Sequence, residues 1–359
     1  MTLFDSIDNE NARHYEHILN TNMIPIFEVN SADALFGAQF IYDNNLNDLF
    51  EYIPQEVRYR VILFVGILER LKPNVLHSYL NLNNCCAGLA ALLVGIPRII
   101  VSCRSYAPYR FSPSTAEWLR DCYSILIKHE SVKMESNSYA GARDYAKWLN
   151  IDEKSITVIH NGIDFSIMKD PPWSDIQAFR KSIVTSSDEK LIVGVFRLSQ
   201  EKGPLDFIDV INKVYSVNKH IKVAICGVGP LLHDVQERIQ QYGLEHVISL
   251  LGRRNDIPVI FSAADISLLA SHFEGFPNAI MESMFYRCPP VATNTGDVAY
   301  LINHGIDGFI HDVGDIDGMA QDIIFLLEND KKRIAMSYKA RKHILNEFSS
   351  DILVSKAVS

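Results

Sequence analysis

The chain has 359 residues, of which 48% are hydrophobic and 21% charged, and its formal net charge is −9. This length favours two domains over a single core, and the acidic balance disfavours a nucleic-acid partner, which requires a basic face. The polar first residues do not resemble a signal peptide, and the longest apolar stretch, residues 87–96, is too short to span a bilayer. The six cysteines are scattered without a CxxC pair, which predicts buried free thiols. We therefore predict a cytoplasmic protein, leaving open a peripheral contact with the inner face of the membrane and the oligomeric state.

Short β-branched segments alternate with amphipathic stretches of helical length along almost the whole chain. In the first half, the predicted strands begin at Pro25, Asn74, Arg98 and Ile156. In the second half, they begin at Leu191, Ile221, Val247, Asp265, Pro289 and Gly308. Strand–helix alternation of this kind predicts an α/β fold whose parallel sheets are covered by helices on both faces.

The alternation breaks at residues 161–173, NGIDFSIMKDPPW, which contain a glycine, a proline pair and several turn formers. We therefore predict an N-terminal domain over residues 1–165, a C-terminal domain over residues 166–345, and a tail over residues 346–359 that could pack back on the first domain. Two doubly wound domains joined at this segment would leave a cleft between the carboxyl ends of their strands. Ligands bind at such ends of parallel strands, so the cleft is the predicted binding site.

The most informative motif is HFEGFPNAIMESM, residues 272–284. Gly275, Phe276 and Pro277 form a tight turn after a strand, and a helix is predicted from Asn278 to Tyr286. Free N–H groups at that helix start would suit a phosphate or a sugar hydroxyl. Glu274 in the turn and Glu282 one turn inside the helix could each accept two hydrogen bonds from a vicinal diol. Either glutamate alone could be merely solvated, but the pair beside this turn favours a ligand site.

A second motif, FRLSQEKGP, covers residues 196–204. Arg197 ends a strand, whereas Lys202 and Gly203 open the next helix. Two cations fixed beside a helix N-terminus can stabilise a diphosphate leaving group without a metal. The alternative is an ordinary surface arginine and lysine.

The segment CGVGPLL, which begins at Cys226, has two glycines of a dinucleotide-binding loop. Its third glycine position is Leu232, and the following strand has no acidic residue at its end, so a nicotinamide cofactor is disfavoured. Gly227 and Gly229 more simply permit close backbone approach to a ligand or to a neighbouring loop.

The order of these motifs resembles glycosyltransferase family four, whose members are retaining nucleotide-sugar transferases of the GT-B fold and include enzymes similar to sucrose and glycogen synthases. The resemblance covers residues 70–345. The segments that carry it are NGID (161–164), R-x4-K-G (197–203), G-x-G-P (227–230), the loop at 252–256, E-G-F-P-N-A-x-x-E-S-M (274–284) and P-V-A-T (290–293).

This resemblance implies the role of each motif. Glu274, with the backbone of Gly275, Phe276, Pro277 and Asn278, would hold the donor sugar. Glu282 would hold the donor ribose, Arg197 and Lys202 would neutralise the diphosphate, and the loops at Gly229 and from Arg253 to Asn255 would cradle the base. In this family the leaving diphosphate is thought to assist deprotonation of the acceptor on the same face of the sugar. No metal, protein nucleophile or cofactor is then required beyond the donor, which we expect to be a UDP- or GDP-sugar.

Two departures from the family pattern concern the N-terminal domain. Members usually begin with a strand and a Gly-rich loop, whereas TLFDSI at the start of this chain looks like the second strand of such a domain. The predicted domain therefore lacks its usual first strand and loop, which is compatible with a fragment, a partner-dependent subunit or an altered fold. Many members also have a histidine near the donor sugar where this chain has Arg104.

Basic and aromatic residues surround Arg104, and no acidic residue occurs between Glu69 and Glu117. We predict that Arg104 and Arg110 face the cleft or an anionic acceptor, such as a lipid-linked saccharide. His77, which lies at the end of a predicted strand, is a further acceptor-side candidate, although a structural role for it is favoured.

The sequence thus predicts a retaining, metal-independent hexosyltransferase that acts on a saccharide or lipid-linked saccharide in polysaccharide, lipopolysaccharide or glycolipid assembly. Two alternatives remain open. One is a non-catalytic or partner-dependent subunit, favoured by the missing N-terminal loop. The other is a sugar-nucleotide epimerase of the GT-B fold, which would need an acid/base residue that no motif indicates.

Overall fold

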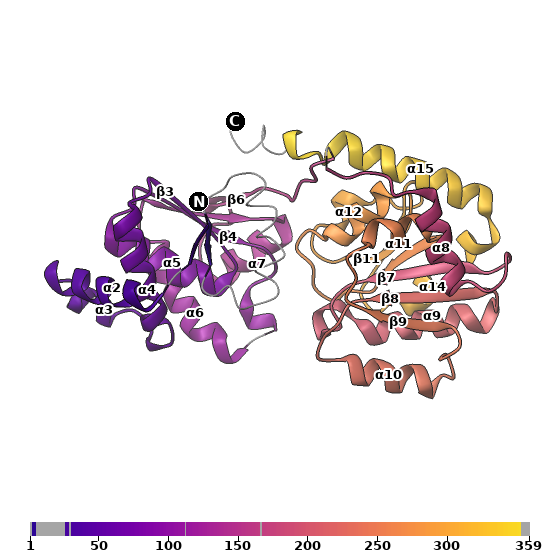
Figure 1. Ribbon diagram of the computed structural model, residues 1–359, viewed down its shortest axis with the longest axis horizontal. Helices are drawn as coiled ribbons and strands as arrows, with labels where there is room; N and C mark the ends of the chain where they lie inside the picture. Colours follow the sequence, from indigo (N-terminus) through magenta and orange to yellow (C-terminus); the bar gives the residue numbers. More distant parts are fainter. Residues whose placement is uncertain (1, 5–25, 29, 112, 166, 353–359) are drawn as a thin grey trace. The chain divides into compact units, whose positions relative to one another are not determined.

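The computed structural model describes residues 2–4, 26–28, 30–111, 113–165 and 167–352 (Figure 1). The chain divides into two compact units. Unit 1 contains residues 1–136 and 142–157, and unit 2 contains residues 137–141 and 158–359. The domain boundary predicted after residue 165 therefore lies inside unit 2, and a short segment from the first half of the chain belongs to unit 2 as well.

Unit 1 contains a two-stranded parallel sheet and a four-stranded sheet. The small sheet pairs β1 (Thr2–Phe4), which comes from the segment TLFDSI, with β2 (Ile26–Glu28). The larger sheet has the order β3 (Val75–Tyr79), β4 (Arg98–Cys103), β5 (Val132–Ser136) and β6 (Ile156–Val158). Its helices are α2 (Ser31–Asp43), α3 (Asn47–Glu51), α4 (Gln55–Leu71), α5 (Asn81–Val94), α6 (Pro113–Leu126) and all but the first three residues of α7 (Tyr139–Leu149), which belong to unit 2.

Helices α2 and α4 approach each other closely because glycines lie where they meet. A Cβ on Gly37 would lie 2.0 Å from the carbonyl oxygen of Ile62, and one on Gly66 would lie 1.9 Å from the carbonyl oxygen of Asp33. Asn30 and Asp33 also form a capping box at the start of α2, which satisfies backbone N–H groups that the helix leaves free. Local capping and tertiary packing therefore agree on where α2 begins.

Unit 2 contains a six-stranded parallel sheet with the order β12-β11-β10-β7-β8-β9. The strands are β7 (Lys190–Val195), β8 (Ile221–Cys226), β9 (Ile248–Gly252), β10 (Ile266–Leu269), β11 (Pro290–Thr293) and β12 (Phe309–His311). The helices are α8 (Trp173–Ile183), α9 (Pro204–Val217), α10 (Leu232–Gln241), α11 (Ile257–Ala263), α12 (Asn278–Phe285), α13 (Val298–Leu301), α14 (Ile316–Glu328) and α15 (Asp330–Glu347). This order is that of a doubly wound fold, and its direction reverses between β7 and β10.

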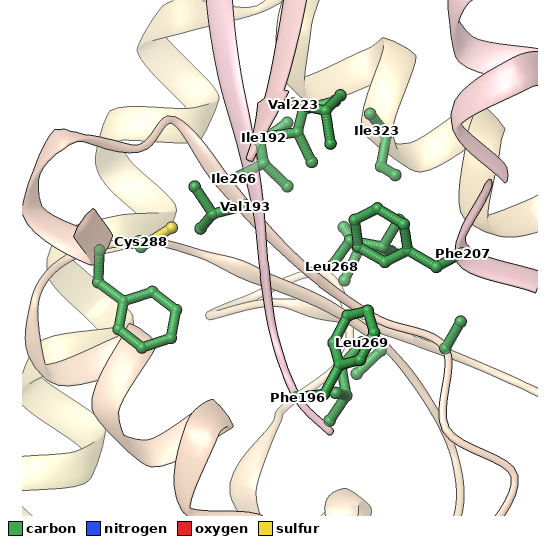
Figure 2. Close-up of a cluster of buried hydrophobic side chains, with 14 of the residues drawn as sticks. Ile192, Val193, Phe196, Phe207, Val223, Ile266, Leu268, Leu269, Cys288 and Ile323 are labelled. Atoms are coloured by element: carbon green, nitrogen blue, oxygen red, sulfur yellow. The ribbon is translucent and has the colours of Figure 1, made fainter. Parts of the chain in front are cut away.

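The core of unit 2 consists of strand residues packed against helices on both faces of the sheet (Figures 1 and 2). Ile192 of β7, Val223 of β8 and Leu268 of β10 are fully buried, and Phe207 of α9 packs with them. Strands covered on both faces have continuous apolar runs instead of alternating ones, which explains why the sequence pattern located the start of each strand within one residue. The six cysteines are free and buried, as predicted.

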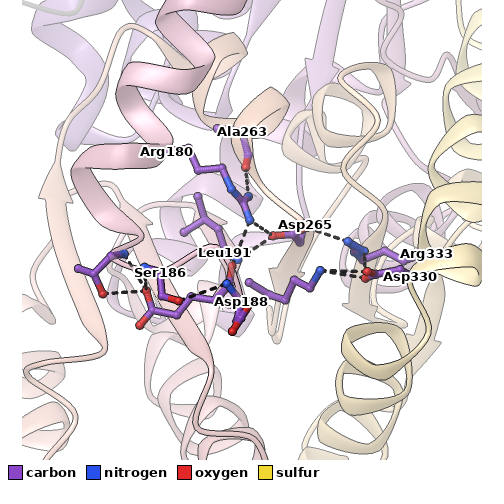
Figure 3. Close-up of polar contacts among 11 residues, drawn as sticks. Arg180, Ser186, Asp188, Leu191, Ala263, Asp265, Asp330 and Arg333 are labelled. Atoms are coloured by element: carbon purple, nitrogen blue, oxygen red, sulfur yellow. Dashed lines mark hydrogen bonds and ion pairs between the residues drawn. The ribbon is translucent and has the colours of Figure 1, made fainter.

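A cluster of charges at the amino end of β10 ties distant segments together (Figure 3). Asp265 accepts hydrogen bonds from the Arg180 guanidinium and from the Leu191 backbone N–H, both at 2.8 Å. Its other oxygen lies 2.9 Å from the guanidinium of Arg333. The cluster therefore joins α8, β7 and α15 at the edge of the sheet opposite the strands' carboxyl ends.

The C-terminal residues that the structure describes pair with the segment that follows β6. The Ile163 N–H donates to the carbonyl of Phe348 at 3.0 Å, and the Ser350 N–H donates to the carbonyl of Ile163 at 2.9 Å. The predicted tail thus contacts unit 2 through its described part, and residues 353–359 lie outside the described residues. Within the described part of the chain, no helix combines the length and the apolar character that crossing a membrane requires.

Candidate functional site

Two of the motifs lie at the carboxyl ends of β7 and β10, where the strand order of unit 2 reverses. Their loops are in backbone contact. A Cβ on Gly203 would lie 2.0 Å from the Ala270 carbonyl oxygen, and the N–H groups of His272 and Phe273 donate to the Glu201 carbonyl at 2.9 and 3.1 Å. Glycine is favoured at position 203 because a Cβ would clash with the Ala270 carbonyl and because its φ of 56° lies in the left-handed region. The fold therefore brings the residues that follow Arg197 against the loop that contains Glu274.

Glu274 is a buried carboxylate held by a fixed cation. Its Oε1 accepts a hydrogen bond from Lys202 Nζ at 2.7 Å and from Ser271 Oγ at 2.8 Å, and only 6% of the residue is exposed. Charge-assisted hydrogen bonds of this kind are about twice as strong as neutral ones. Lys202 therefore contacts Glu274 directly, a pairing that the sequence analysis did not predict. Ser271 was not identified from the sequence, and its position just after β10 is the only clue that it offers.

The helix α12 begins at Asn278, directly after the turn formed by Gly275, Phe276 and Pro277. Pro277 occupies the N-cap position, and no side chain caps the helix there. The Ile280 N–H donates to the Pro277 carbonyl at 3.2 Å, whereas the N–H groups of the first turn before it have no side-chain cap and can face a bound group together with the positive end of the helix dipole.

Glu282 lies inside α12 and differs from Glu274 in its surroundings. It is partly buried, and among the described residues no basic side chain forms an ion pair with it. Burial disfavours its charged form and raises the pKa of its carboxyl to about 7. The site therefore contains one carboxylate that is already compensated and one that is not.

The glycines that follow β8 are explained by the loop beside them. A Cβ on Gly227 would lie 1.8 Å from the carbonyl oxygen of Phe196, and one on Gly229 would lie 2.3 Å from that of Leu198. Of the two roles proposed for these glycines, the structure shows close approach to the neighbouring loop. Arg197 in that loop is exposed.

The loop after β9 is organised by an ion pair within it. Arg254 donates to both carboxylate oxygens of Asp256, at 2.8 and 2.6 Å. The side chains of Arg253 and Asn255, which the sequence analysis singled out, are exposed on either side of Arg254. This arrangement leaves both side chains accessible to a ligand.

A row of three asparagines runs to the start of α12. Asn161 Nδ2 donates to Asn278 Oδ1 at 2.8 Å and to the Phe276 carbonyl at 3.0 Å, and Asn137 Nδ2 lies 3.5 Å from Asn161 Oδ1. Among the described residues, the buried Oδ1 of Asn137 has no hydrogen-bond partner. Asn137 and Asn161 were not identified as site residues, although Asn161 belongs to the NGID segment.

In unit 1, two of the three predicted acceptor-side residues belong to one polar cluster at the ends of β3, β4 and β5. His77 Nε2 lies 2.8 Å from Ser102 Oγ and 3.4 Å from Glu135 Oε2, and the Arg104 guanidinium lies 5.5 Å from the centre of the Tyr79 ring. The hydrogen bond from His77 is the main cause that lowers the pKa of Glu135, and the charge of Arg104 adds to it. Glu135 was missed because β5 itself was missed.

Arg110, the third acceptor-side candidate, contacts a different acidic residue. Its Nη2 lies 2.6 Å from Oδ1 of Asp144. The Tyr109 hydroxyl and the Ala107 N–H also donate to Asp144, which is almost fully buried. The structure therefore gives Arg110 a structural partner that the sequence pattern did not indicate.

Comparison with known proteins shows which family and which folds the chain is similar to. Residues 175–343 match the family described as glycosyl transferases group 1. The chain is 26% identical over 281 residues to the Vi polysaccharide biosynthesis protein VipC/TviE of Salmonella typhi, covering 77% of this chain and 48% of that protein. It is 25% identical over 292 residues to an Escherichia coli UDP-Gal:alpha-D-GlcNAc-diphosphoundecaprenol alpha-1,3-galactosyltransferase, covering 80% of this chain and 75% of that one. The chain thus spans about half the length of the first of these relatives.

Among solved structures, the chain is similar to Anabaena Alr3699/HepE, a protein crystallised with UDP and glucose. The TM-score is 0.78 at 20% identity, and the alignment covers 96% of this chain and 88% of that one. This likeness confirms the predicted GT-B fold class, with its two Rossmann-like domains. Through residues 175–343, which make up a little less than half of its length, the chain is similar to the family of group 1 glycosyl transferases.

Proposed function

We propose that this chain transfers a sugar from a nucleoside diphosphate sugar to an acceptor hydroxyl, with retention of configuration at the sugar carbon. The observation that carries the proposal is the Lys202–Glu274 pair at the switch point of unit 2, 2.7 Å apart and bordered by the uncapped start of α12. A compensated carboxylate can accept hydrogen bonds from sugar hydroxyls, while the cation beside it can face a phosphate. Ligands of doubly wound folds bind at this point of the sheet.

The donor sugar would be held by Glu274 and by the backbone from Gly275 to Asn278. The lysine ammonium has three donors. Lys202 can therefore keep its hydrogen bond to Glu274 and still contact a diphosphate oxygen. Arg197, which is exposed in the adjoining loop, would supply the second cation. Two cations that neutralise the leaving diphosphate allow a mechanism without a metal, and the family resemblance supports the same conclusion.

The nucleoside would be held by Glu282 and by the loops that follow β8 and β9. Glu282 has unused acceptor capacity for a ribose diol, and Arg253 and Asn255 are exposed beside the position proposed for the base. We favour uridine over guanosine, because HepE was crystallised with UDP and the Escherichia coli relative is named for UDP-Gal.

The acceptor would be an anionic or lipid-linked saccharide, as the name of the Escherichia coli relative suggests. We propose Arg104 and His77 as residues that contact it, and the lipid portion would bring the protein to the membrane surface. Arg104→Ala should raise the acceptor KM about tenfold and leave the donor KM unchanged, because one charge-assisted contact is worth about 1.5–3 kcal/mol. Arg110→Ala is the informative comparison, because it removes a partner of the buried Asp144 and should mainly lower stability. An unchanged acceptor KM in Arg104→Ala would remove Arg104 from the acceptor site.

The proposal as a whole is tested by a binding and turnover screen of the full chain. UDP-glucose, UDP-galactose, UDP-N-acetylglucosamine, GDP-mannose and ADP-glucose would be compared by thermal shift and calorimetry, because a ligand that binds only the folded state raises Tm. We expect at least one uridine diphosphate sugar to stabilise the protein. A folded chain that none of the five sugars stabilises would show the proposal to be wrong. Neither the non-catalytic subunit nor the epimerase gains support from the relatives described above.

A further inference from the structure

A buried aspartate, Asp297, lies between β11 and α13 and is only 1% exposed. Its Oδ2 accepts hydrogen bonds from the Tyr139 N–H at 2.7 Å and from His160 Nε2 at 2.8 Å. Its Oδ1 accepts one from the Ala140 N–H at 3.0 Å. All four residues belong to unit 2. The carboxylate is thus held by three donors, two of which are backbone groups at the start of a helix.

The same aspartate is bonded to the turn before α12. The Asp297 N–H donates to the Gly275 carbonyl at 3.0 Å. The residue before it, Gly296, is pressed so closely against this turn that a Cβ there would lie 2.2 Å from the Glu274 carbonyl oxygen. Asp297 therefore contacts the turn with its backbone and the α7 start with its side chain.

His160 adds a second contact between the carboxylate and the turn. While its Nε2 is bonded to Asp297, its ring is stacked on the Phe276 ring with 4.4 Å between centroids. The next residue, Asn161, donates to the Phe276 carbonyl at 3.0 Å. Two consecutive residues thus fix both the ring and the backbone of Phe276.

The turn itself has few means of fixing its own position. Gly275 has no side chain, and the proline at 277 has no N–H to donate. Its conformation therefore depends on external contacts, and two of those described above involve Asp297, one through its backbone N–H and one through His160, which its carboxylate holds. Because a buried charge that loses its hydrogen-bond donors is strongly disfavoured, any shift of the carboxylate is resisted on three sides.

We propose that Asp297 is a positioning residue that holds the Gly275–Asn278 turn in the geometry needed to bind the donor sugar. This inference rests on the proposed function, which assigns that turn to the sugar and assigns the nucleoside to Glu282 and the loop at Arg253. A role of this kind has a consequence that general stabilisation does not have. Disturbing Asp297 should weaken binding of the nucleotide sugar and leave binding of the free nucleotide unchanged.

The test is calorimetric titration of wild-type and Asp297→Asn protein with UDP and with the uridine diphosphate sugar that the wild type binds. The amide cannot accept from all three donors, because its NH2 group would face one of them. We expect affinity for the nucleotide sugar to fall at least tenfold and affinity for UDP to change less than twofold. His160→Phe is the second variant. It keeps a ring against Phe276 but removes one donor, so it should show the same split with a smaller loss.

The matched control is Asp307→Asn. Asp307 is 2% exposed, lies 2.9 Å from His343 Nδ1, and accepts from the Asn303 N–H at 2.7 Å. It has the same chemistry as Asp297 without any contact to the turn, so its variant should lose stability but keep both affinities.

The outcomes separate the two proposals. Wild-type protein that binds no nucleotide sugar would overturn the proposed function. Wild-type protein that binds one, with variants at Asp297 and His160 that lose UDP and nucleotide-sugar affinity equally or lose neither, would overturn the positioning role alone. If Asp297→Asn fails to fold, His160→Phe decides the question.

Discussion

Glu274 and Glu282 belong to the same short motif, yet their surroundings differ in kind. Glu274 is buried against Lys202 and Ser271, so its charge is compensated before any ligand arrives. Glu282 is partly buried and forms no ion pair with a described basic residue, and the pKa of its carboxyl is raised to about 7. The difference shows that a pair of carboxylates can combine a preorganised anchor with a group that depends on its ligand, even when both contact one substrate. Three experiments test this contrast.

The largest effect is expected at the compensated carboxylate. Glu274→Gln removes a charge that organises Lys202 and leaves a single oxygen to accept from both Ser271 and the ligand. We expect the kcat/KM for the donor to fall by about 10²–10³-fold, comparable with the loss of one preorganised polar contact in other active sites. Steady-state kinetics at saturating acceptor would measure it.

Glu189→Gln is the matched control for that variant. Glu189 accepts hydrogen bonds from Thr185, and its Oε1 lies 3.7 Å from Lys222 Nζ. It precedes β7, at the opposite end of the strand from the site. This variant should retain the wild-type kcat/KM. A loss below tenfold in Glu274→Gln, in a folded protein, would remove Glu274 from the centre of the site.

A second experiment displaces the backbone turn at Glu274 and leaves the residues around Glu282 in place. In Gly296→Ala, the new Cβ would lie 2.2 Å from the Glu274 carbonyl and 2.5 Å from that of Gly275. We expect the donor KM to rise about tenfold or more, because a small displacement of a binding loop has large effects. Gly243→Ala isolates backbone strain, because Gly243 has the same φ of 64° and open space around it. Gly243→Ala should lower the free energy of unfolding by about 1 kcal/mol and leave the donor KM unchanged. Equal donor KM values in the two variants would contradict the close-contact argument.

The smallest effect is expected at Glu282, and it should depend on pH. Because the folded-state pKa of Glu282 lies above its ordinary value of 4.5, its contribution to stability is full below pH 4.5 and is lost as the pH rises towards 7. That loss amounts to about 3 kcal/mol at most, at roughly 1.4 kcal/mol for each pKa unit. Glu282→Gln should remove this loss and so be more stable than the wild type at pH 8, as measured by Tm across the pH range.

The same group should make donor binding depend on pH. A ribose diol donates to the ionised carboxylate, so wild-type affinity for the nucleotide sugar should rise about tenfold as the pH increases through 7. Glu282→Gln should bind more weakly at pH 8 and show a flat profile from pH 6 to 8. A wild-type profile that is equally flat would mean that the ligand does not contact Glu282.

Most of the fold could be predicted from the sequence because the strands of unit 2 are buried on both faces and form continuous apolar runs. The exception is β5, whose residues alternate between the two faces of its sheet. Val132, Met134 and Ser136 are buried, whereas Lys133 is exposed, so the strand reads VKMES. A charged residue at every second position resembles a helix surface unless a period of two is sought. Because β5 was not predicted from the sequence, Glu135 was not recognised as a site residue either.

The site could be predicted at the level of motifs but not of partners. The E-x7-E spacing locates both glutamates, yet nothing in it distinguishes the one that Lys202 neutralises. Arg110 illustrates the same difficulty. Its acidic partner, Asp144, comes from a separate helix, and only the tertiary fold brings the two together at 2.6 Å. Asp297 is concealed for a similar reason, because its donors come from the start of α7 and from the segment after β6.

The charge cluster at Asp265 has a consequence for how the chain is completed during synthesis. Asp265 obtains one cation from Arg180 in α8 and the other from Arg333 in α15 (Figure 3). Domains generally fold as units while the chain is being made from its N-terminus. Unit 2 also includes residues 137–141, which emerge well before its first strand. Its polar contacts thus span a segment made early and a helix made much later, and unit 2 reaches its final structure only after α15 has been synthesised.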